Sequence, residues 1–184
     1  MAVSIHRFAR KALPPPVFYL ARQAYRRVRA STVATGYADR FPSRRDLKIY
    51  PVQPAAELHV FWKVLPIGRG PAFSLFLHQD EVLRFDCFGA GDGHFHATFA
   101  HGTSSSQSRI YLAEPNAAEQ VARVEFELLN NLDYYLQRHP WRRIRKTRID
   151  RVRLATAMSA AKADALGFLD SVPDLAGLSG RADT

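Results

Sequence analysis

The sequence predicts an α+β fold: a four- or five-stranded antiparallel β-meander, with one long helix packed on its apolar face and helical basic arms on either side. Three observations predict it. Residues 57–112 alternate between apolar and polar side chains in short runs, turn-forming sequences separate these runs, and residues 115–138 repeat apolar side chains at helical spacing. Short loops between successive strands indicate antiparallel neighbours, and the apolar helix stripe needs a sheet face to cover.

Four segments are expected to be strands, 57–65, 71–78, 82–88 and 94–100, and residues 109–112 are expected to form a short fifth. Side chains alternate across a strand, so each strand divides its residues between two faces of the sheet. One face is apolar throughout and is the expected core face; it holds Phe73, Leu75, Leu77, Leu83, Phe85, Cys87, Phe95, Ala97 and Phe99.

The opposite face is polar and carries the candidate ligand-binding residues Arg84, Asp86, His94 and His96. Loop lengths favour pairing of Phe88 with His94, which places Asp86 opposite His96. Directly opposed residues have Cβ atoms about 4.5–5.5 Å apart. The parity of each strand is better determined than this exact pairing, because a one-residue slip would turn the phenylalanines to water.

Two interpretations of the His94-Phe95-His96 sequence remain open. With Asp86, the two imidazoles could form a two-His, one-carboxylate metal site. The alternative is an Asp–His cross-strand pair beside a solvated second histidine. A Ser74–Asp86–His96 triad is disfavoured, because a triad needs the histidine in the middle and the predicted register puts the aspartate there; no catalytic residue is assigned.

Two helices are expected after the strands. The first runs from Pro115 to Arg138, because its apolar residues recur every three or four positions, and His139-Pro140 ends it. The second is rich in alanine and is expected to run from Asp150, as N-cap, to Phe168.

Charge and composition divide the chain into three regions: a basic, proline-containing arm and linker over 1–56, a core domain over 57–138, and a basic segment, alanine-rich helix and frayed tail over 139–184. Residues 1–30 hold seven basic residues and no acid. Residues 138–153 hold seven arginines and one lysine against one acid. The net charge of +9 therefore belongs to the arms.

The basic segment after residue 138 is a candidate surface for a polyanion. Such a run can neutralise phosphates, and its tryptophan could stack on a base or sit in a lipid interface, so the expected partners are nucleic acid or an anionic membrane surface. The alternative is a solvated face that folds back on the acidic core. The candidate residues are Trp141, Arg142, Arg143, Arg145, Lys146 and Arg148.

The composition favours a cytoplasmic protein. The single cysteine, Cys87, excludes an internal disulfide and fits a reducing compartment. No stretch approaches the roughly 18 consecutive apolar residues of a membrane span. An acid-free, arginine-containing start is also typical of mitochondrial transit peptides, but Pro14-Pro15-Pro16 interrupts the amphipathic helix that import requires. Whether the N-terminal arm is a targeting segment is left open.

The stretch 82–89, with an Arg-Phe-Asp-x-Phe pattern, the His-x-His strand and the helix with Asn131-Leu132 near its end resemble an uncharacterised family of short bacterial proteins, known only as a domain of unknown function. The resemblance covers roughly residues 57–137. It implies the strand–helix order derived above and no activity, and it carries over Arg84, Asp86 and the two histidines. The chain departs from the family pattern in its basic arms and in Phe95, where tyrosine is usual.

The leading interpretation is a non-catalytic binding or interaction module that uses the polar sheet face around Arg84, Asp86, His94 and His96. One alternative is a nucleic-acid or anionic-membrane adaptor that works through the basic arms. The other is a metal-binding protein or enzyme with a His-x-His plus Asp site. No cofactor is required by the sequence, and a divalent metal ion is the candidate.

Overall fold

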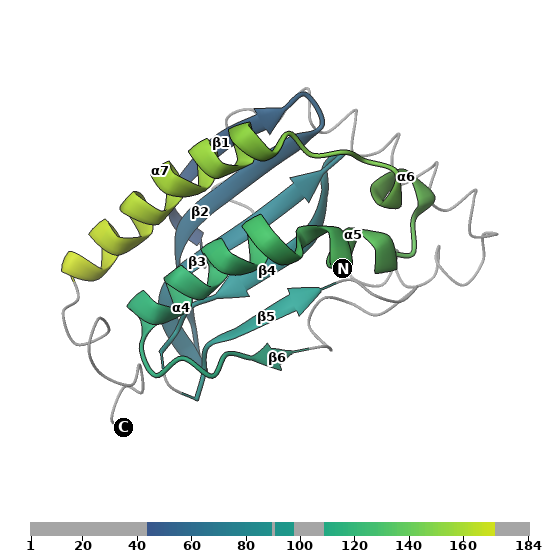
Figure 1. Cartoon of the computed structure of the whole chain (residues 1–184). Helices are drawn as coiled ribbons and strands as arrows, with labels where there is room; N and C mark the ends of the chain where they lie inside the picture. Colours follow the sequence, from purple (N-terminus) through teal and green to yellow (C-terminus); the bar gives the residue numbers. More distant parts are fainter. Residues whose placement is uncertain (1–43, 90, 98–108, 172–184) are drawn as a thin grey trace, which may run out of the picture. The chain divides into compact units, whose positions relative to one another are not determined.

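The computed structural model describes residues 44–89, 91–97 and 109–171 (Figure 1). Its strands are β1 (Arg44–Gln53), β2 (Ala56–Leu65), β3 (Gly68–Leu77), β4 (Asp80–Asp86), β5 (His94–Ala97) and β6 (Ile110–Tyr111). Its helical elements are α4 (Ala117–Phe126), a π-helical turn (Glu127–Asn131), α5 (Leu132–Arg138), α6 (Arg142–Arg145) and α7 (Arg151–Asp170). The strands form one antiparallel meander in the order β1 to β6, which confirms the predicted α+β class.

The sheet has six strands, and β1 lies within the region that we expected to be a linker. Sequence reasoning missed this strand because it carries Pro51 and lacks clean alternation: Lys48 and Ile49 are both exposed. A proline removes a ladder donor and is therefore tolerated mainly on an edge strand, and β1 is the edge of this sheet. A bulge between Arg45 and Lys48, where Asp46 has φ +54°, disturbs the pattern further.

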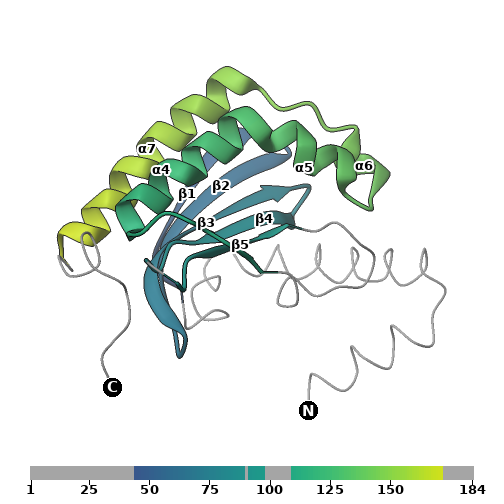
Figure 2. The same ribbon diagram turned by 60° about the horizontal axis from the view of Figure 1, so that its bottom comes forward.

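Two helices, α4 and α7, lie side by side on one face of the sheet (Figure 1 and Figure 2). Their inward residues share a buried core with the apolar sheet face, and this core includes Phe73, Phe85, Val121, Val124, Leu154, Ala157, Met158 and Ala161. Small alanine side chains let α7 approach the sheet closely. Helix α7, which follows residue 138, therefore contributes to the core, and the described residues belong to one compact unit, Ser43–Thr184.

The helix ends follow local rules. Asn116 caps α4 by accepting a hydrogen bond from the Glu119 amide, so the helix begins at Ala117, two residues later than its proline suggested. Asp150 caps α7 through the Arg153 amide, as expected. The π-helical turn begins at Glu127, which is 2% exposed and accepts hydrogen bonds from Asn131 and Tyr135.

Some expectations fall outside the described residues: the N-terminal arm up to residue 43, strand residues 98–100 with the expected core residue Phe99, and the tail beyond residue 171. No helix in the described ranges is long and apolar enough to cross a membrane.

Candidate functional site

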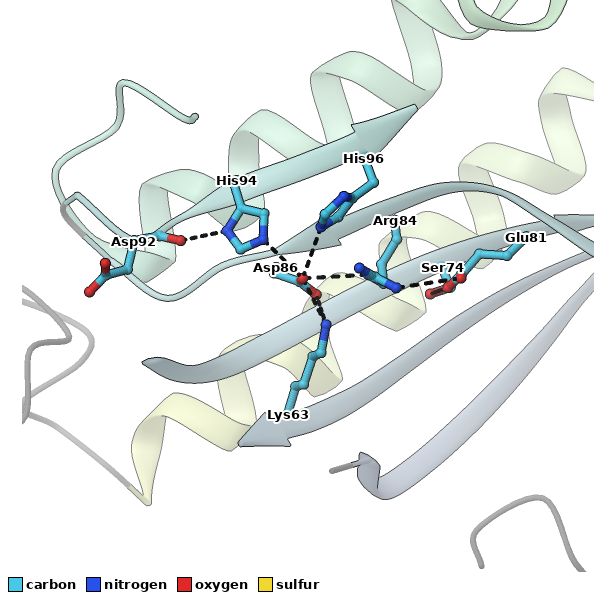
Figure 3. A network of polar contacts seen from close by, with 8 residues as sticks. All are labelled: Lys63, Ser74, Glu81, Arg84, Asp86, Asp92, His94 and His96. Atoms are coloured by element: carbon cyan, nitrogen blue, oxygen red, sulfur yellow. Dashed lines mark hydrogen bonds and ion pairs between the residues drawn. The ribbon is translucent and has the colours of Figure 1, made fainter. Parts of the chain in front are cut away.

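The polar sheet face gathers a cluster of ionisable side chains from β2, β4 and β5 (Figure 3). Parity places Lys63, Arg84, Asp86, His94 and His96 on the side opposite the helices, as the alternation predicted. Asp86, His94 and His96 are 0–3% exposed. The four candidate ligand residues are therefore brought together; Asp86 and the two histidines are buried, and Arg84 is partly buried.

The register differs from the predicted one by two residues. Asp86 lies opposite His94, and Arg84 lies opposite His96. The loop between β4 and β5 accounts for the shift: it folds back on itself through a hydrogen bond from the Gly93 amide to the Gly89 carbonyl. Gly89 has φ +85°, a backbone conformation that glycine adopts readily. A two-residue shift keeps every side chain on its predicted face.

Asp86 is the centre of the cluster. Its two oxygens accept hydrogen bonds from Lys63 Nζ at 2.8 and 2.7 Å, and Arg84 Nε lies 3.4 Å from Oδ2. Burial by itself would raise the pKa of Asp86, but the contact with His96 and the charges of Lys63 and Arg84 more than reverse this and hold the pKa below its usual range. Asp86 is therefore ionised at neutral pH.

His94 is held in one orientation. Its Nδ1 lies 2.7 Å from the Asp92 carbonyl oxygen, which can only accept, so Nδ1 carries the hydrogen. Its Nε2 then faces Asp86 Oδ2 at 3.3 Å. Burial lowers the pKa of His94, although the Asp92 carbonyl and the Asp86 charge oppose this, so the neutral ring turns a lone pair toward a carboxylate oxygen. Two acceptors that face each other are stabilised by a cation between them.

His96 lacks the hydrogen bonds that a buried imidazole normally makes. It is 3% exposed, and neither ring nitrogen has a hydrogen-bond partner among the described residues. Its Nε2 lies 3.7 Å from Asp86 Oδ2, beyond hydrogen-bond distance, and its ring meets that of His94 edge-on with centroids 4.9 Å apart. Buried polar groups without partners are rare and often mark an ion or ligand site.

The β4–β5 loop is fixed from the helix side by Gln120, a buried residue of α4. Its Oε1 accepts from the Gly89 amide at 2.9 Å, and its Nε2 donates to the Gly89 and Glu114 carbonyls at 2.8 and 2.9 Å. A Cβ at Gly93 would lie 2.2 Å from Gln120 Oε1, so any larger residue there would displace the Gln120 amide. This clamp sets the position of the Asp92 carbonyl and hence the orientation of His94.

The serine of the cluster serves a different partner. Ser74 Oγ donates to Glu81 Oε1 at 2.5 Å, and Glu81 also lies 3.6 Å from Arg84 Nη1. The serine hydrogen thus points at a carboxylate and not at an imidazole, an arrangement unsuited to a nucleophile activated by histidine.

The polyanion candidates lie in α6 and the residues that flank it, and no contact between described residues joins them to Asp86 or its histidines. Two residues of the site were not among the candidates. Alternation along its strand had placed Lys63 on the polar face, but nothing in the sequence singled it out as a partner of Asp86. Gln120 could not be predicted, because its partners are backbone groups of a distant loop.

The chain matches no family model, no curated protein and no solved structure. The resemblance to the bacterial family with the Arg-Phe-Asp-x-Phe and His-x-His strands therefore stays a prediction.

Proposed function

We propose that this chain is a metal-binding protein that holds one divalent transition-metal ion through Asp86, His94 and His96. One observation carries the proposal: the three side chains offer one ligand atom each, and these atoms all lie within 4.8 Å of one another on a buried face. The sequence favoured a non-catalytic binding module on this sheet face, and the metal site proposed here is the His-x-His plus Asp alternative on the same face.

The separations suit ligands of a common ion. Asp86 Oδ2 lies 3.3 Å from His94 Nε2 and 3.7 Å from His96 Nε2, both too long for good hydrogen bonds. Two ligands of one tetrahedral zinc ion lie about 3.4 Å apart, given bond lengths of about 2.0–2.1 Å. The hydrogen bond from His94 Nδ1 to a backbone carbonyl is the outer-shell contact that orients most metal-bound histidines.

Charge determines what else the ion takes. Without an ion, Lys63 and Arg84 balance Asp86 and Glu81, which lie within 3.6 Å of one or the other cation. A divalent ion adds positive charge to a buried site, so its remaining coordination positions favour an anionic oxygen ligand such as hydroxide. Lys63 can keep Oδ1 of Asp86 while Oδ2 turns to the ion. Two imidazoles with one carboxylate suit zinc, iron(II) or manganese(II) better than magnesium or calcium.

The test is metal content and titration of the purified full chain. We expect about one zinc ion per chain by elemental analysis after dialysis against zinc, and a visible Co²⁺ absorption spectrum on titration, since cobalt reports coordination by nitrogen ligands. His94→Asn and His96→Asn should each lose the ion and the spectrum. Magnesium and calcium should not compete.

The matched control is His78→Asn. His78 is exposed and is bonded through Nε2 to Thr147 Oγ1 at 3.0 Å, and asparagine tolerates its φ of +50°. This variant should bind metal as the wild type does. Equal metal content in all three variants, or no metal in the wild type, would overturn the proposal.

A further inference from the structure

The basic segment after α5 contains two kinds of cationic side chain. Three arginines are engaged by other groups of the protein: Arg143 pairs with Asp80 of β4, Arg145 Nη1 donates to the carbonyls of His139 and Pro140 at 2.7 Å each, and Arg151 pairs with Asp133 at 2.7 Å. The Arg143 and Arg151 contacts attach the segment to β4 and α5, and the Arg145 contacts brace it internally. They are structural, and they also neutralise the acidic residues nearest to the segment.

The other kind faces solvent. Arg142, Lys146 and Arg148 are exposed, and none of their side chains makes a hydrogen bond or ion pair with a described residue. Residues 134–149 contain no acid, and the flanking Asp150 caps α7 and lies 3.5 Å from Arg153. Arg142 and Lys146 are four residues apart across α6, so they project from the same side of this short helix.

The apolar residues of the segment face inward. Ile144 is 0% exposed, and Trp141 packs against the main core, with the Arg143 guanidinium 4.7 Å from its ring centre and the His139 ring at 5.5 Å. An amphipathic membrane-surface helix needs an outward apolar face to enter the lipid, and this segment presents none. Trp141 is likewise placed for packing and not for stacking on a base.

We propose that Arg142, Lys146 and Arg148 form a surface that binds the phosphodiester backbone of nucleic acid without reading its sequence. Cations that no acid among the described residues neutralises, in a segment whose apolar side chains pack inward, match a partner whose recognition is electrostatic. This surface lies apart from the Asp86–His94–His96 site and does not depend on it.

The test uses the full chain and a labelled mixed-sequence duplex of about 20 base pairs, with binding followed by fluorescence anisotropy between about 50 and 200 mM NaCl. Each lost phosphate contact lowers the slope of log affinity against log salt by about 0.9 for duplex and 0.7 for single strands. The double variant Arg142→Gln with Lys146→Gln should therefore flatten the slope by up to about 1.8 for the duplex and by up to about 1.4 for the corresponding single strand.

The matched control removes the same charge elsewhere. Arg45 and Arg109 are exposed and have no side-chain hydrogen bond or ion pair with described residues. Arg45→Gln with Arg109→Gln should change the duplex slope by less than about 0.5. Because all four side chains are exposed, both double variants should melt as the wild type does.

Three outcomes would overturn the proposal. The wild type could fail to bind either nucleic acid at about 50 mM salt. The two double variants could show equal slopes, in which case binding follows net charge and not this surface. Vesicles with anionic lipid could bind while both nucleic acids do not, in which case the segment is a lipid-binding surface.

Discussion

Replacing Lys63 with methionine tests whether the buried charge cluster is as tightly coupled as its geometry indicates. The substitution removes the ammonium that donates to both oxygens of Asp86 and keeps much of the side-chain volume. The side chains of Lys63 and Asp86 are 7% and 1% exposed, so water does not screen the pair. Lys63→Met therefore leaves a buried carboxylate with fewer partners.

The expected loss is about 3 kcal/mol in the free energy of unfolding. Removing one partner of a buried ion pair costs about 3–5 kcal/mol, because the other charge stays buried without compensation. The lower end applies here because Arg84 remains 3.4 Å from Asp86 Oδ2. Lys63→Met combined with Asp86→Leu should lose less than the sum of the two single variants, because the double variant leaves neither charge of the pair uncompensated.

The assay is urea unfolding of the full chain in metal-free buffer at neutral pH, followed by tryptophan fluorescence and analysed by linear extrapolation. A loss below about 1 kcal/mol for Lys63→Met, or additive losses in the double variant, would refute the coupled cluster, since about 1 kcal/mol is what a screened surface pair contributes.

Zinc adds a second arm to the same experiment. If Asp86 helps to hold the ion, zinc at about 100 times its dissociation constant should stabilise the wild type by about 2.7 kcal/mol. Zinc should stabilise Lys63→Met by at least as much, because the Lys63 ammonium is absent and no longer competes with zinc for the Asp86 carboxylate. A zinc effect that is equally large in His96→Asn would mean that the ion binds elsewhere.

Three further predictions concern the parts of the fold that hold the site and the basic segment. Gln120→Leu removes the hydrogen bonds that hold the β4–β5 loop, and it should lower the free energy of unfolding by roughly 3 kcal/mol. It should also weaken zinc binding by about 10-fold in a calorimetric titration. Unchanged zinc affinity in the folded variant would exclude a positioning role for Gln120. Tyr50→Phe removes the hydrogen bond from the tyrosine to Asp164 on α7 and should cost about 1 kcal/mol at neutral pH. Burial, then the hydrogen bond and charge of Asp164, raise the pKa of Tyr50 to about 12. The stabilisation by this hydrogen bond is therefore present below the unfolded pKa of about 10 and is lost as pH rises through about 12. The difference in unfolding free energy between wild type and Tyr50→Phe, measured in urea, should be smaller at a pH of about 11 than at about 8, and a constant difference would contradict the assignment. Trp141→Ala should lower stability by about 2–3 kcal/mol while leaving the salt slope of nucleic-acid binding unchanged, because its ring packs on the core; a flatter slope without a loss of stability would place the ring at the nucleic acid instead.

The sequence determined which side chains share a face. Alternation along a strand is a local, two-fold property, so Phe73, Phe85 and Phe95 could be placed in the core, and Asp86 and His94 on the polar face, without knowledge of how the strands pair. The helix caps followed for the same reason: Asp150 bonds an amide three residues away, and such short-range contacts are visible in the sequence.

The tertiary structure decided how far these local patterns are shifted and what covers them. Register depends on the turn. Because the Gly89–Gly93 loop folds back on itself, Asp86 pairs with His94 and not with His96 as the loop length had suggested. A bulge between Leu75 and Phe76 likewise shifts the pairing of β3 with β4. The number of strands also depended on tertiary pairing. The proline and bulge of β1 mask its strand pattern in the sequence, and only its pairing with β2 shows that it belongs to the sheet.

The character of the site is also a long-range result. Lys63 and Asp86 are 23 residues apart in the sequence, and Gln120 is 31 residues from Gly89, so neither contact can be recognised from the local sequence pattern. Burial completes the difference. The same carboxylate and imidazoles in water would be ordinary surface groups, whereas their removal from solvent lowers the pKa of His94 and leaves His96 without a hydrogen bond to any described residue. Desolvation depends on how the whole chain packs, and for that reason the sequence could name the residues of the site but only the folded structure could give them their chemistry.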